Sequence, residues 1–239
     1  MTYLSWNEQT ITDFSESNIS DMYNRGYVFT RIGKGVMHQT RSVRIDLSKF
    51  GLTSENRRIL KKTGNLDVTM NGLPLREYDW NLGKMAKDFY EKKFGPGIMS
   101  AQKAKEMLSD GALSSFNALL EYTLYDINQV KPEKEGSAPS SAGSLIGYAI
   151  CHQNKNLLHY SYPFYDLEKS PADMGMGMMI RAIEYAMKAG LKHIYLGSLQ
   201  RPGDTYKLQF QGLEWFDGKT WQTDLEEAKK ALLSEVSPA

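Results

Sequence analysis

The stretch that decides the fold comprises residues 160–166 (Tyr-Ser-Tyr-Pro-Phe-Tyr-Asp), 174–177 (Met-Gly-Met-Gly) and 193–197 (His-Ile-Tyr-Leu-Gly). Apolar positions between residues 176 and 191 recur at helical spacing, and Gly190 stands where a helix-ending glycine is expected. These patterns predict a strand, a helix and a second strand in a βαβ-like unit. The N-terminus of that helix would present free backbone N–H groups, which suit a phosphate or a developing oxyanion.

The segments before this unit favour strands, and the segment after it favours a helix. Residues 145–152 and 156–164 alternate between apolar and polar positions, which predicts a hairpin. Residues 129–144 are polar and rich in Pro, Gly and Ser, which predicts a mobile loop. Residues 223–234 open with an N-cap pattern and predict a closing helix.

The N-terminal part of the sequence contains both kinds of pattern. We predict strands over residues 27–31, 36–47 and 66–70, and helices over residues 53–64, 78–94 and 101–108. Thr53 or Ser54 is a candidate N-cap for the first of these helices, and Gly64 ends it.

Antiparallel strands, a central helix that opens on glycines and a following strand are typical of the acetyltransferase (GNAT) type of α/β fold. We therefore predict an α/β protein with a mixed sheet and flanking helices. Residues 1–112 would form a smaller, basic α+β part, and residues 113–239 the acetyltransferase-like catalytic part. The two parts are expected to pack intimately.

Length, composition and charge limit the possible classes of protein. The 239 residues, 41% of them apolar, suffice for one large domain or two small ones. Residues 1–105 carry 17 Lys and Arg against 11 Asp and Glu, which points to a polyanionic partner or simply to solvated basic helices. Cys151 is the only cysteine, so no disulfide is expected. The sequence shows no signal-peptide pattern and no membrane-spanning apolar run, which predicts a cytoplasmic protein.

Two blocks of sequence resemble those of a known enzyme family. The first comprises residues 42–50, 54–62 and 66–68, and the second residues 162–166, 174–175, 183–186, 190–191, 194–197, 206–207, 210 and 213–214. The paired Arg57-Arg58, the Tyr-Leu-Gly at 195–197 and the Tyr-Lys at 206–207 are their most specific features. Over about residues 22–216 the chain resembles the aminoacyl-tRNA–protein transferases, which comprise the arginyltransferases and the bacterial leucyltransferases that act on N-terminal Asp or Glu.

The resemblance implies that the protein transfers an amino acid, arginine or leucine, from aminoacyl-tRNA to the N-terminal α-amine of a protein or peptide, within the N-degron pathway. It also implies that no cofactor is needed. An amine attacks an activated ester in this reaction, so the enzyme positions the reactants, stabilises the oxyanion and removes a proton. Two alternatives stay open, namely a CoA-dependent N-acyltransferase and a non-catalytic binder of tRNA or protein N-termini.

The chain departs from the family pattern at several places. Residues 37–41 (Met-His-Gln-Thr-Arg) stand where the family has an N-terminal cysteine cluster, so no metal or iron–sulfur site is expected. Leu167 replaces the proline that follows the aspartate, and Asp173 replaces a serine. The CoA-binding signature at the helix start is incomplete, because Ala172 stands at its first position.

The densest positive patch of the chain comprises Arg57, Arg58, Lys61 and Lys62. Guanidinium groups bind phosphate or carboxylate in a bidentate way, and the resemblance places paired arginines here. We expect this patch to bind tRNA phosphate or an acceptor carboxylate, with a solvated helix face as the alternative. Arg44 is a further candidate, with an internal ion pair to an acid such as Asp46 as its alternative.

The candidate catalytic residues are Asp166, Tyr162 and Tyr206. Asp166 would accept the proton of the amine or bind the aminoacyl α-ammonium, unless it is a turn aspartate. Tyr162 and Tyr165 would line a pocket for the aminoacyl group, although aromatic strand residues more often belong to a core.

The remaining candidate residues of the βαβ unit bind substrate. Gly175 and Gly177 would open the helix N-terminus, and Lys207 would contact the terminal phosphates of tRNA, unless it is a surface lysine on an edge strand. None of the histidines is spaced as part of a metal site, namely His38, His152, His159 and His193.

Overall fold

The computed structural model describes residues 3–125 and 143–234, except for the side chain of Ser234. Most of the loop predicted over residues 129–144 lies outside the described residues.

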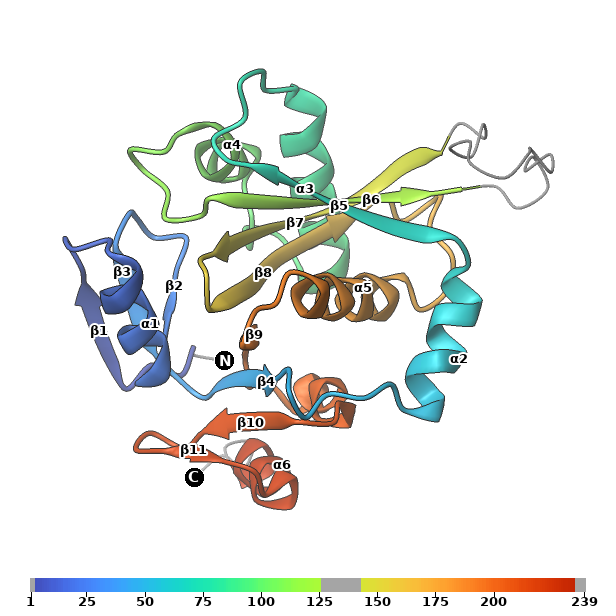
Figure 1. Ribbon diagram of the computed structural model, residues 1–239. Helices are drawn as coiled ribbons and strands as arrows, with labels where there is room; N and C mark the ends of the chain where they lie inside the picture. Colours follow the sequence, from blue (N-terminus) through green and yellow to red (C-terminus); the bar gives the residue numbers. More distant parts are fainter. Residues whose placement is uncertain (1–2, 126–142, 235–239) are drawn as a thin grey trace.

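An eight-stranded mixed sheet forms the centre of the molecule (Figure 1). Its strands, in spatial order, are β11 (Trp221–Gln222), β10 (Leu213–Phe216), β4 (Ser42–Asp46), β9 (His193–Ser198), β8 (Leu157–Tyr165), β7 (Ser144–Gln153), β6 (Ala118–Leu124) and β5 (Leu66–Gly72). All neighbouring strands are antiparallel except β8 and β9, which are parallel. Helix α5 (Met174–Lys188) connects these two strands, which confirms the predicted βαβ unit.

A three-stranded antiparallel sheet lies beside the large one, and its strands in spatial order are β1 (Asn7–Thr10), β3 (Val36–Gln39) and β2 (Tyr27–Phe29). The prediction of one strand over residues 36–47 is wrong, because β3 belongs to this small sheet and β4 to the large one. The Gly26 carbonyl accepts hydrogen bonds from the Thr40 amide at 3.4 Å and the Ser42 hydroxyl at 2.8 Å. A continuous strand would offer the Thr40 amide to a neighbouring strand, but here this amide is already bonded to Gly26.

The helices agree closely with the sequence patterns. They are α1 (Glu16–Asn24), α2 (Ser54–Thr63), α3 (Trp80–Phe94), α4 (Ala101–Ser109), α5, the 3₁₀ helix η2 (Pro202–Gln209) and α6 (Leu225–Ser234). Thr53 and Asn56 form a reciprocal capping box at the start of α2. Gly190 follows α5 at φ +70°, a left-handed conformation that glycine adopts without strain.

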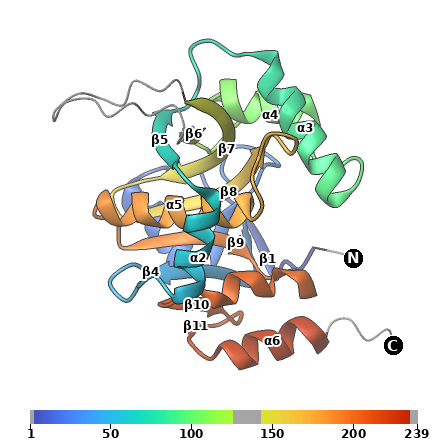
Figure 2. The ribbon, with the colours of Figure 1, turned by 90° about the vertical axis from the view of Figure 1, so that its right-hand side faces the viewer.

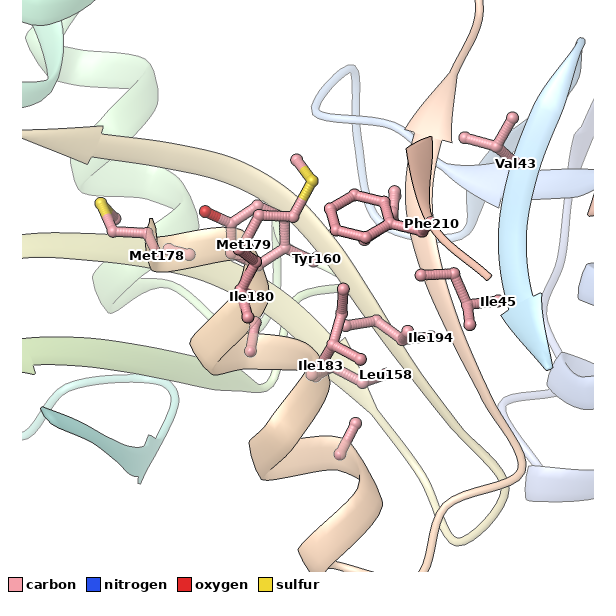
Figure 3. Close-up of a cluster of buried hydrophobic side chains, with 14 of the residues drawn as sticks. Val43, Ile45, Leu158, Tyr160, Met178, Met179, Ile180, Ile183, Ile194 and Phe210 are labelled. Atoms are coloured by element: carbon pink, nitrogen blue, oxygen red, sulfur yellow. The ribbon is translucent and has the colours of Figure 1, made fainter. Parts of the chain in front are cut away.

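Two hydrophobic cores lie on opposite faces of the large sheet. Leu158 contributes to the core beneath α5 and α2, whereas its neighbour Leu157 contributes to the core beneath α1, α3 and α4. Successive strand side chains point to opposite faces, which explains this division. Figure 3 shows Ile180 and Ile183 of α5 packed against the sheet, and burial of each such side chain stabilises the fold by about 2 kcal/mol.

The strands on both sides of residue 112 join one sheet, since β5 pairs with β6 and β4 pairs with β9. Figure 2 shows the helices α3 and α4 on one side of this sheet and α2 and α5 on the other. The division into parts 1–112 and 113–239 stays a prediction.

Candidate functional site

The parallel strands β8 and β9 separate part-way along their length. They pair only from Leu157 and His193 to His159 and Tyr195, after which β8 continues to Tyr165 and β9 to Ser198. We call this region the strand opening. The carboxyl ends of parallel strands beside a crossover helix are a common place for ligands in α/β sheets.

Four tyrosines gather around the strand opening, and we call Tyr90, Tyr160, Tyr162 and Tyr206 the tyrosine cluster. They come from α3, β8 and η2, and Tyr90 lies within electrostatic reach of the other three. Burial raises the pKa of Tyr162 to about 12, although the charge of Arg31 opposes this shift. Burial raises the pKa of Tyr90 and Tyr160 as well. The three hydroxyls therefore stay protonated at neutral pH and each keeps a proton that it can donate.

Three cations and one carboxylate accompany the tyrosine cluster in the described part of the chain. Arg31, from the loop between β2 and β3, lies close enough to Tyr90 and Tyr162 to affect both. The Arg201 guanidinium lies 5.5 Å from the ring centroid of Phe94, at the end of α3. The cations suit an anionic substrate group.

The carboxylate near the cluster, Asp204, is already engaged by backbone amides. It accepts hydrogen bonds from the amides of Gln200 at 2.8 Å and Arg201 at 3.0 Å. Lys207 is buried and donates to the Ser198 carbonyl at 2.7 Å, so it is not the exposed edge lysine that the alternative described.

The start of α5, where the sequence predicts an anion site, carries an aspartate, and the anion site stays a prediction. Asp173 stands at the N-cap with φ +64°, and its carboxylate lies 2.9 Å from the Lys62 ammonium. That hydrogen bond lowers the pKa of Asp173. The Asp173 side chain makes no capping hydrogen bond to the first amides of α5, because its carboxylate is paired with Lys62 instead.

The glycines of α5 serve packing instead. A Cβ atom on Gly177 would lie 2.5 Å from the Thr63 methyl carbon of α2, so glycine is required for this close approach. Gly175 faces the hydroxyl of Tyr165, 3.6 Å from where its Cβ would be. Tyr165 also packs on Phe89 with ring centroids 4.7 Å apart, which favours the core role that the sequence left as an alternative.

Asp166 forms a turn at the end of β8. Its carboxylate accepts hydrogen bonds from the amides of Glu168 at 2.9 Å and Lys169 at 3.2 Å, and it pairs with the Lys169 ammonium. Burial alone would raise the pKa of Asp166, but these bonds and the nearby charge lower it overall. A carboxyl with a lowered pKa is a poor proton acceptor at neutral pH, which does not fit the predicted catalytic role.

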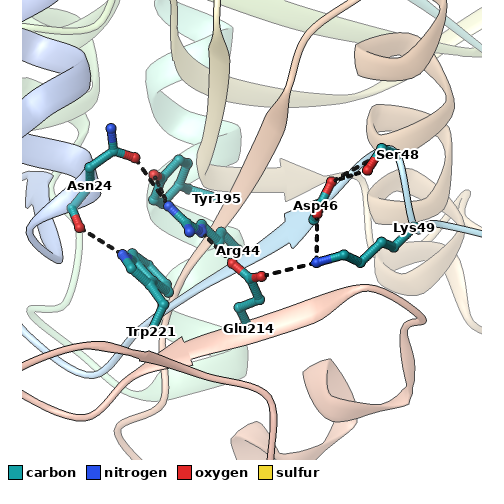
Figure 4. Close-up of polar contacts among 8 residues, drawn as sticks. All are labelled: Asn24, Arg44, Asp46, Ser48, Lys49, Tyr195, Glu214 and Trp221. Carbon is teal, nitrogen blue, oxygen red and sulfur yellow. Dashed lines mark hydrogen bonds and ion pairs between the residues drawn. The ribbon is translucent and has the colours of Figure 1, made fainter.

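Arg44 forms an internal network rather than an exposed contact (Figure 4). Its Nε lies 2.8 Å from a carboxylate oxygen of Glu214, its Nη1 lies 3.3 Å from the Tyr195 hydroxyl, and its guanidinium stacks 4.0 Å above the Trp221 ring. The ion-pair alternative was correct in kind, but its partner is Glu214 of the adjacent strand β10 rather than Asp46. The structure thus gives Arg44 no contact with the tyrosine cluster.

The basic residues of α2 lie on its exposed surface, and this surface is separate from the strand opening. Arg58 forms a bidentate pair with Glu55, and Arg57 donates to the Leu52 carbonyl at 2.6 Å. Lys61 is exposed, and Lys62 is the partner of Asp173. The surface connects to α5 through this last pair.

Sequence reasoning missed three residues beside the cluster, namely Tyr90, Arg31 and Arg201. Each comes from a different segment, and no spacing pattern relates them. Only the pairing of the strands and the packing of α3 on β8 bring them together. Tyr162, Tyr206 and Lys207, by contrast, were candidates and do lie at the strand opening.

Two hollows of the described surface lie elsewhere. One of about 450 Å³ lies beside η2, β10 and α6, and one of about 430 Å³ lies between Phe14, Lys34 and Asn117. Within residues 3–125 and 143–234, no group of three or more His, Cys, Asp or Glu side chains is arranged to bind a metal ion. Among the described helices, none is long and apolar enough to cross a membrane.

Comparison with known proteins gives related results at three levels. The family model described as "Arginine-tRNA-protein transferase, C terminus" matches residues 91–217. An aspartate/glutamate leucyltransferase of Saccharophagus degradans is 26% identical over 183 residues, which cover 76% of this chain and 70% of that protein. One of Dinoroseobacter shibae is 26% identical over 188 residues, and the match covers 76% of this chain and 61% of that protein.

Two solved structures are more distantly similar. The structure of L-PGS from Bacillus licheniformis matches with a TM-score of 0.43 and 10% identity, covering 92% of this chain and 70% of that one. FemX matches with a TM-score of 0.41 and 10% identity, covering 77% of this chain and 60% of that one.

The site lies in a mixed α/β sheet, where two parallel strands separate beside their crossover helix. The family match covers just over half of the chain, so the chain belongs to the arginine-tRNA-protein transferase family. It is an enzyme of the aminoacyl-tRNA–protein transferase class.

Proposed function

We propose that this protein transfers leucine from leucyl-tRNA to the α-amine of proteins that begin with Asp or Glu, in the cytoplasm. The relatives from S. degradans and D. shibae carry this activity in their names. The observation that carries the choice of substrates is the charge around the tyrosine cluster, where three cations, Arg31, Arg201 and Lys207, outnumber one carboxylate, Asp204.

This charge pattern favours leucine over arginine as the transferred amino acid. An arginyl side chain would require a carboxylate partner, and Asp204 already accepts two backbone hydrogen bonds. A leucyl side chain can instead contact the tyrosine rings. The same cations suit an acidic first residue of the acceptor or the phosphates at the tRNA terminus.

We further propose that β8, α5 and β9 form an acetyltransferase-like (GNAT-type) catalytic unit, supported by their parallel pairing and crossover helix. CoA is disfavoured as the donor, because the CoA-binding signature at the α5 start is incomplete, with Ala172 at its first position. The α2 surface, with Arg57, Arg58 and Lys61, is our proposed contact for the tRNA backbone.

Single-turnover transfer tests the donor and the acceptor together. The assay compares radiolabelled Leu-tRNA and Arg-tRNA, without CoA, on peptides that differ only in the first residue, which is Asp, Glu, Arg, Lys or Ala. We expect transfer of leucine to the Asp and Glu peptides alone. Transfer of arginine would overturn the donor assignment. No transfer, with a melting temperature raised by acetyl-CoA, would support the N-acyltransferase alternative.

The same assay tests the α2 surface through the Arg57→Ala/Arg58→Ala double variant. We expect a raised KM for tRNA and a weaker salt dependence of binding, because phosphate contacts release counterions. The KM for the peptide should not change. If the double variant binds tRNA as tightly as the unaltered protein, α2 is not part of the tRNA interface.

A further inference from the structure

We propose that the Lys207 amine carries the proton from the attacking α-amine to the leaving ribose oxygen during aminoacyl transfer. The proposal rests on the proposed function and deepens it by naming the proton carrier. It replaces the predicted role of Lys207 in binding terminal tRNA phosphates.

The geometry of Lys207 is unusual for a lysine that merely binds an anion. The residue is only 8% exposed, and its Nζ donates to the Ser198 carbonyl at 2.7 Å. Among the described residues no carboxylate lies within 4.0 Å of Nζ. Buried lysines are ordinarily paired with an acid, because an unpaired buried charge is costly. The hydrogen bond to the Ser198 carbonyl orients Nζ, but unlike an ion pair with a carboxylate it does not require the amine to be protonated.

The position of Nζ places it at the strand opening. Ser198 ends β9 beyond its last pairing with β8, and Gly197 just before it has φ +77°. Nζ lies 3.9 Å from where a Cβ of Gly197 would be, and 5.8 Å from the ring centroid of Tyr206. The amine is therefore next to the tyrosine cluster, where the substrates are proposed to meet.

The charged and titratable groups around Nζ come from both elements packed against it. Burial lowers the pKa of Lys207, Asp204 of η2 opposes this effect, and Arg201 reinforces it. His159 of β8 is also within electrostatic reach, and its own pKa is lowered to about 3 by burial, by His152 and by Lys207. Because the imidazole is neutral, it contributes no charge that would keep Nζ protonated. A lysine in such surroundings can be a neutral amine and thus a base.

The proposed step is balanced in atoms and protons. The acceptor nitrogen attacks the ester carbonyl carbon of aminoacyl-tRNA and forms the new C–N bond while its proton moves to Nζ. The C–O bond to the ribose then breaks, and the departing oxygen takes the proton from Nζ, so Lys207 ends neutral. Protonated tyrosine hydroxyls can donate hydrogen bonds to the carbonyl oxygen as negative charge develops on it.

The decisive experiment compares the unaltered protein with Lys207→Arg and with Lys207→Cys before and after aminoethylation. Aminoethylated cysteine restores an amine that is intrinsically more acidic than that of lysine, whereas arginine retains the charge but cannot release a proton. Because Cys151 and position 207 are both buried, the alkylation is carried out on the unfolded variant in a Cys151→Ala background and verified by mass spectrometry after refolding. Each variant is first shown to keep the melting temperature of the unaltered protein.

We expect Lys207→Arg to lose single-turnover transfer by roughly 10²-fold or more with an unchanged peptide KM. Aminoethylation of Lys207→Cys should restore transfer and shift the acid limb of the pH–rate profile to lower pH. An active Lys207→Arg variant, a failure of aminoethylation to restore activity, or a restored variant with an unshifted profile would each overturn the proposal.

A readout without tRNA separates this proposal from the proposed function. Trace labelling with acetic anhydride, read by mass spectrometry across pH, reports when Lys207 becomes a neutral amine, with a free lysine side-chain amine in a short peptide as reference. We expect Lys207 to deprotonate at a lower pH than the reference amine. If both deprotonate together, the proton-carrier role fails even when leucine transfer is observed. If Lys207 deprotonates early but no transfer occurs, the proposed function fails instead.

Discussion

At the scale of single residues, Arg44 links three parts of the molecule through one guanidinium. It pairs with Glu214 across β4 and β10, and its Nη1 lies 3.2 Å from the Asn24 side-chain oxygen of α1. Both members of the ion pair are about seven-eighths buried, so neither charge is well solvated. Such a pair is sensitive to loss of one partner, because the other is left buried and unpaired.

We predict that Glu214→Gln lowers the free energy of unfolding by on the order of 3 kcal/mol, because it leaves the Arg44 charge without its carboxylate. Urea unfolding followed by fluorescence measures the change. Lys49→Met is the matched control, since Lys49 is exposed and lies 3.7 Å from the same carboxylate. It should leave the unfolding midpoint nearly unchanged. Equal losses in the two variants would show that the network has no special role.

Arg44 also shows which contacts could not be predicted from the sequence. The sequence could predict that Arg44, on a strand with apolar neighbours, either binds a ligand or pairs internally. It could not identify Glu214 as the partner, because that depends on the pairing of β4 with β10, which are 170 positions apart at this contact. Tyr90 and Arg31 escaped notice for the same reason.

At the scale of elements, helix α5 depends on its contact with α2. The Cβ of a residue at position 177 would lie 2.5 Å from the Thr63 methyl carbon, whereas at position 175 the nearest atom would be 3.6 Å away. The two glycines look alike in sequence, but only one is required for packing.

Gly177→Ala should therefore destabilise the protein by roughly 1–3 kcal/mol, because α2 must move away from α5. Gly175→Ala should leave stability unchanged or slightly raised, since alanine favours a helix more than glycine does. Thermal unfolding of both variants measures the difference. Gly175→Ala also tests the predicted anion site, because loss of transfer in a fully stable variant would support a binding role for the α5 start.

Periodicity predicted the elements well where one signal dominated. The helix over residues 53–64 and the hairpin before α5 appear as α2 and as β7 with β8. The strand over residues 36–47 was wrong because its alternation continues through Thr40 and Arg41, where hydrogen bonds to Gly26 and Leu199 turn the chain. Alternation gives the face of each side chain but not the sheet to which the strand belongs.

At the scale of the whole molecule, the small sheet and α1 join the large sheet through buried rings. The Tyr23 hydroxyl lies 2.9 Å from Nδ1 of His159, and the His152 ring packs near Tyr23 and Phe29. Burial lowers the pKa of His159 to about 3 and that of His152 to about 4. Both imidazoles are therefore neutral in the folded protein.

Stability should fall as the pH drops from about 6.5 to 5. Both folded-state pKa values lie below the unfolded value, so the unfolded chain binds protons first and each histidine costs up to about 1.4 kcal/mol per pH unit. Denaturant unfolding at successive pH values measures the slope. Asp46, whose pKa is lowered to about 2 by Ser48 and Lys49, acts only at lower pH. His159→Gln should reduce the slope by one histidine's share, and an unchanged slope would exclude His159.

The order of strands in the large sheet has a consequence for the way the protein is made. Strand β4 ends at residue 46, yet its two neighbours, β9 and β10, are synthesised about 150 residues later. During translation the backbone N–H and C=O groups of β4 and the side chains of Val43 and Ile45 stay without partners until the rest of the chain has emerged from the ribosome. The short, charged sequence around β4, with Arg44 and Asp46 alternating between these apolar residues, suits a strand that must stay soluble through that delay.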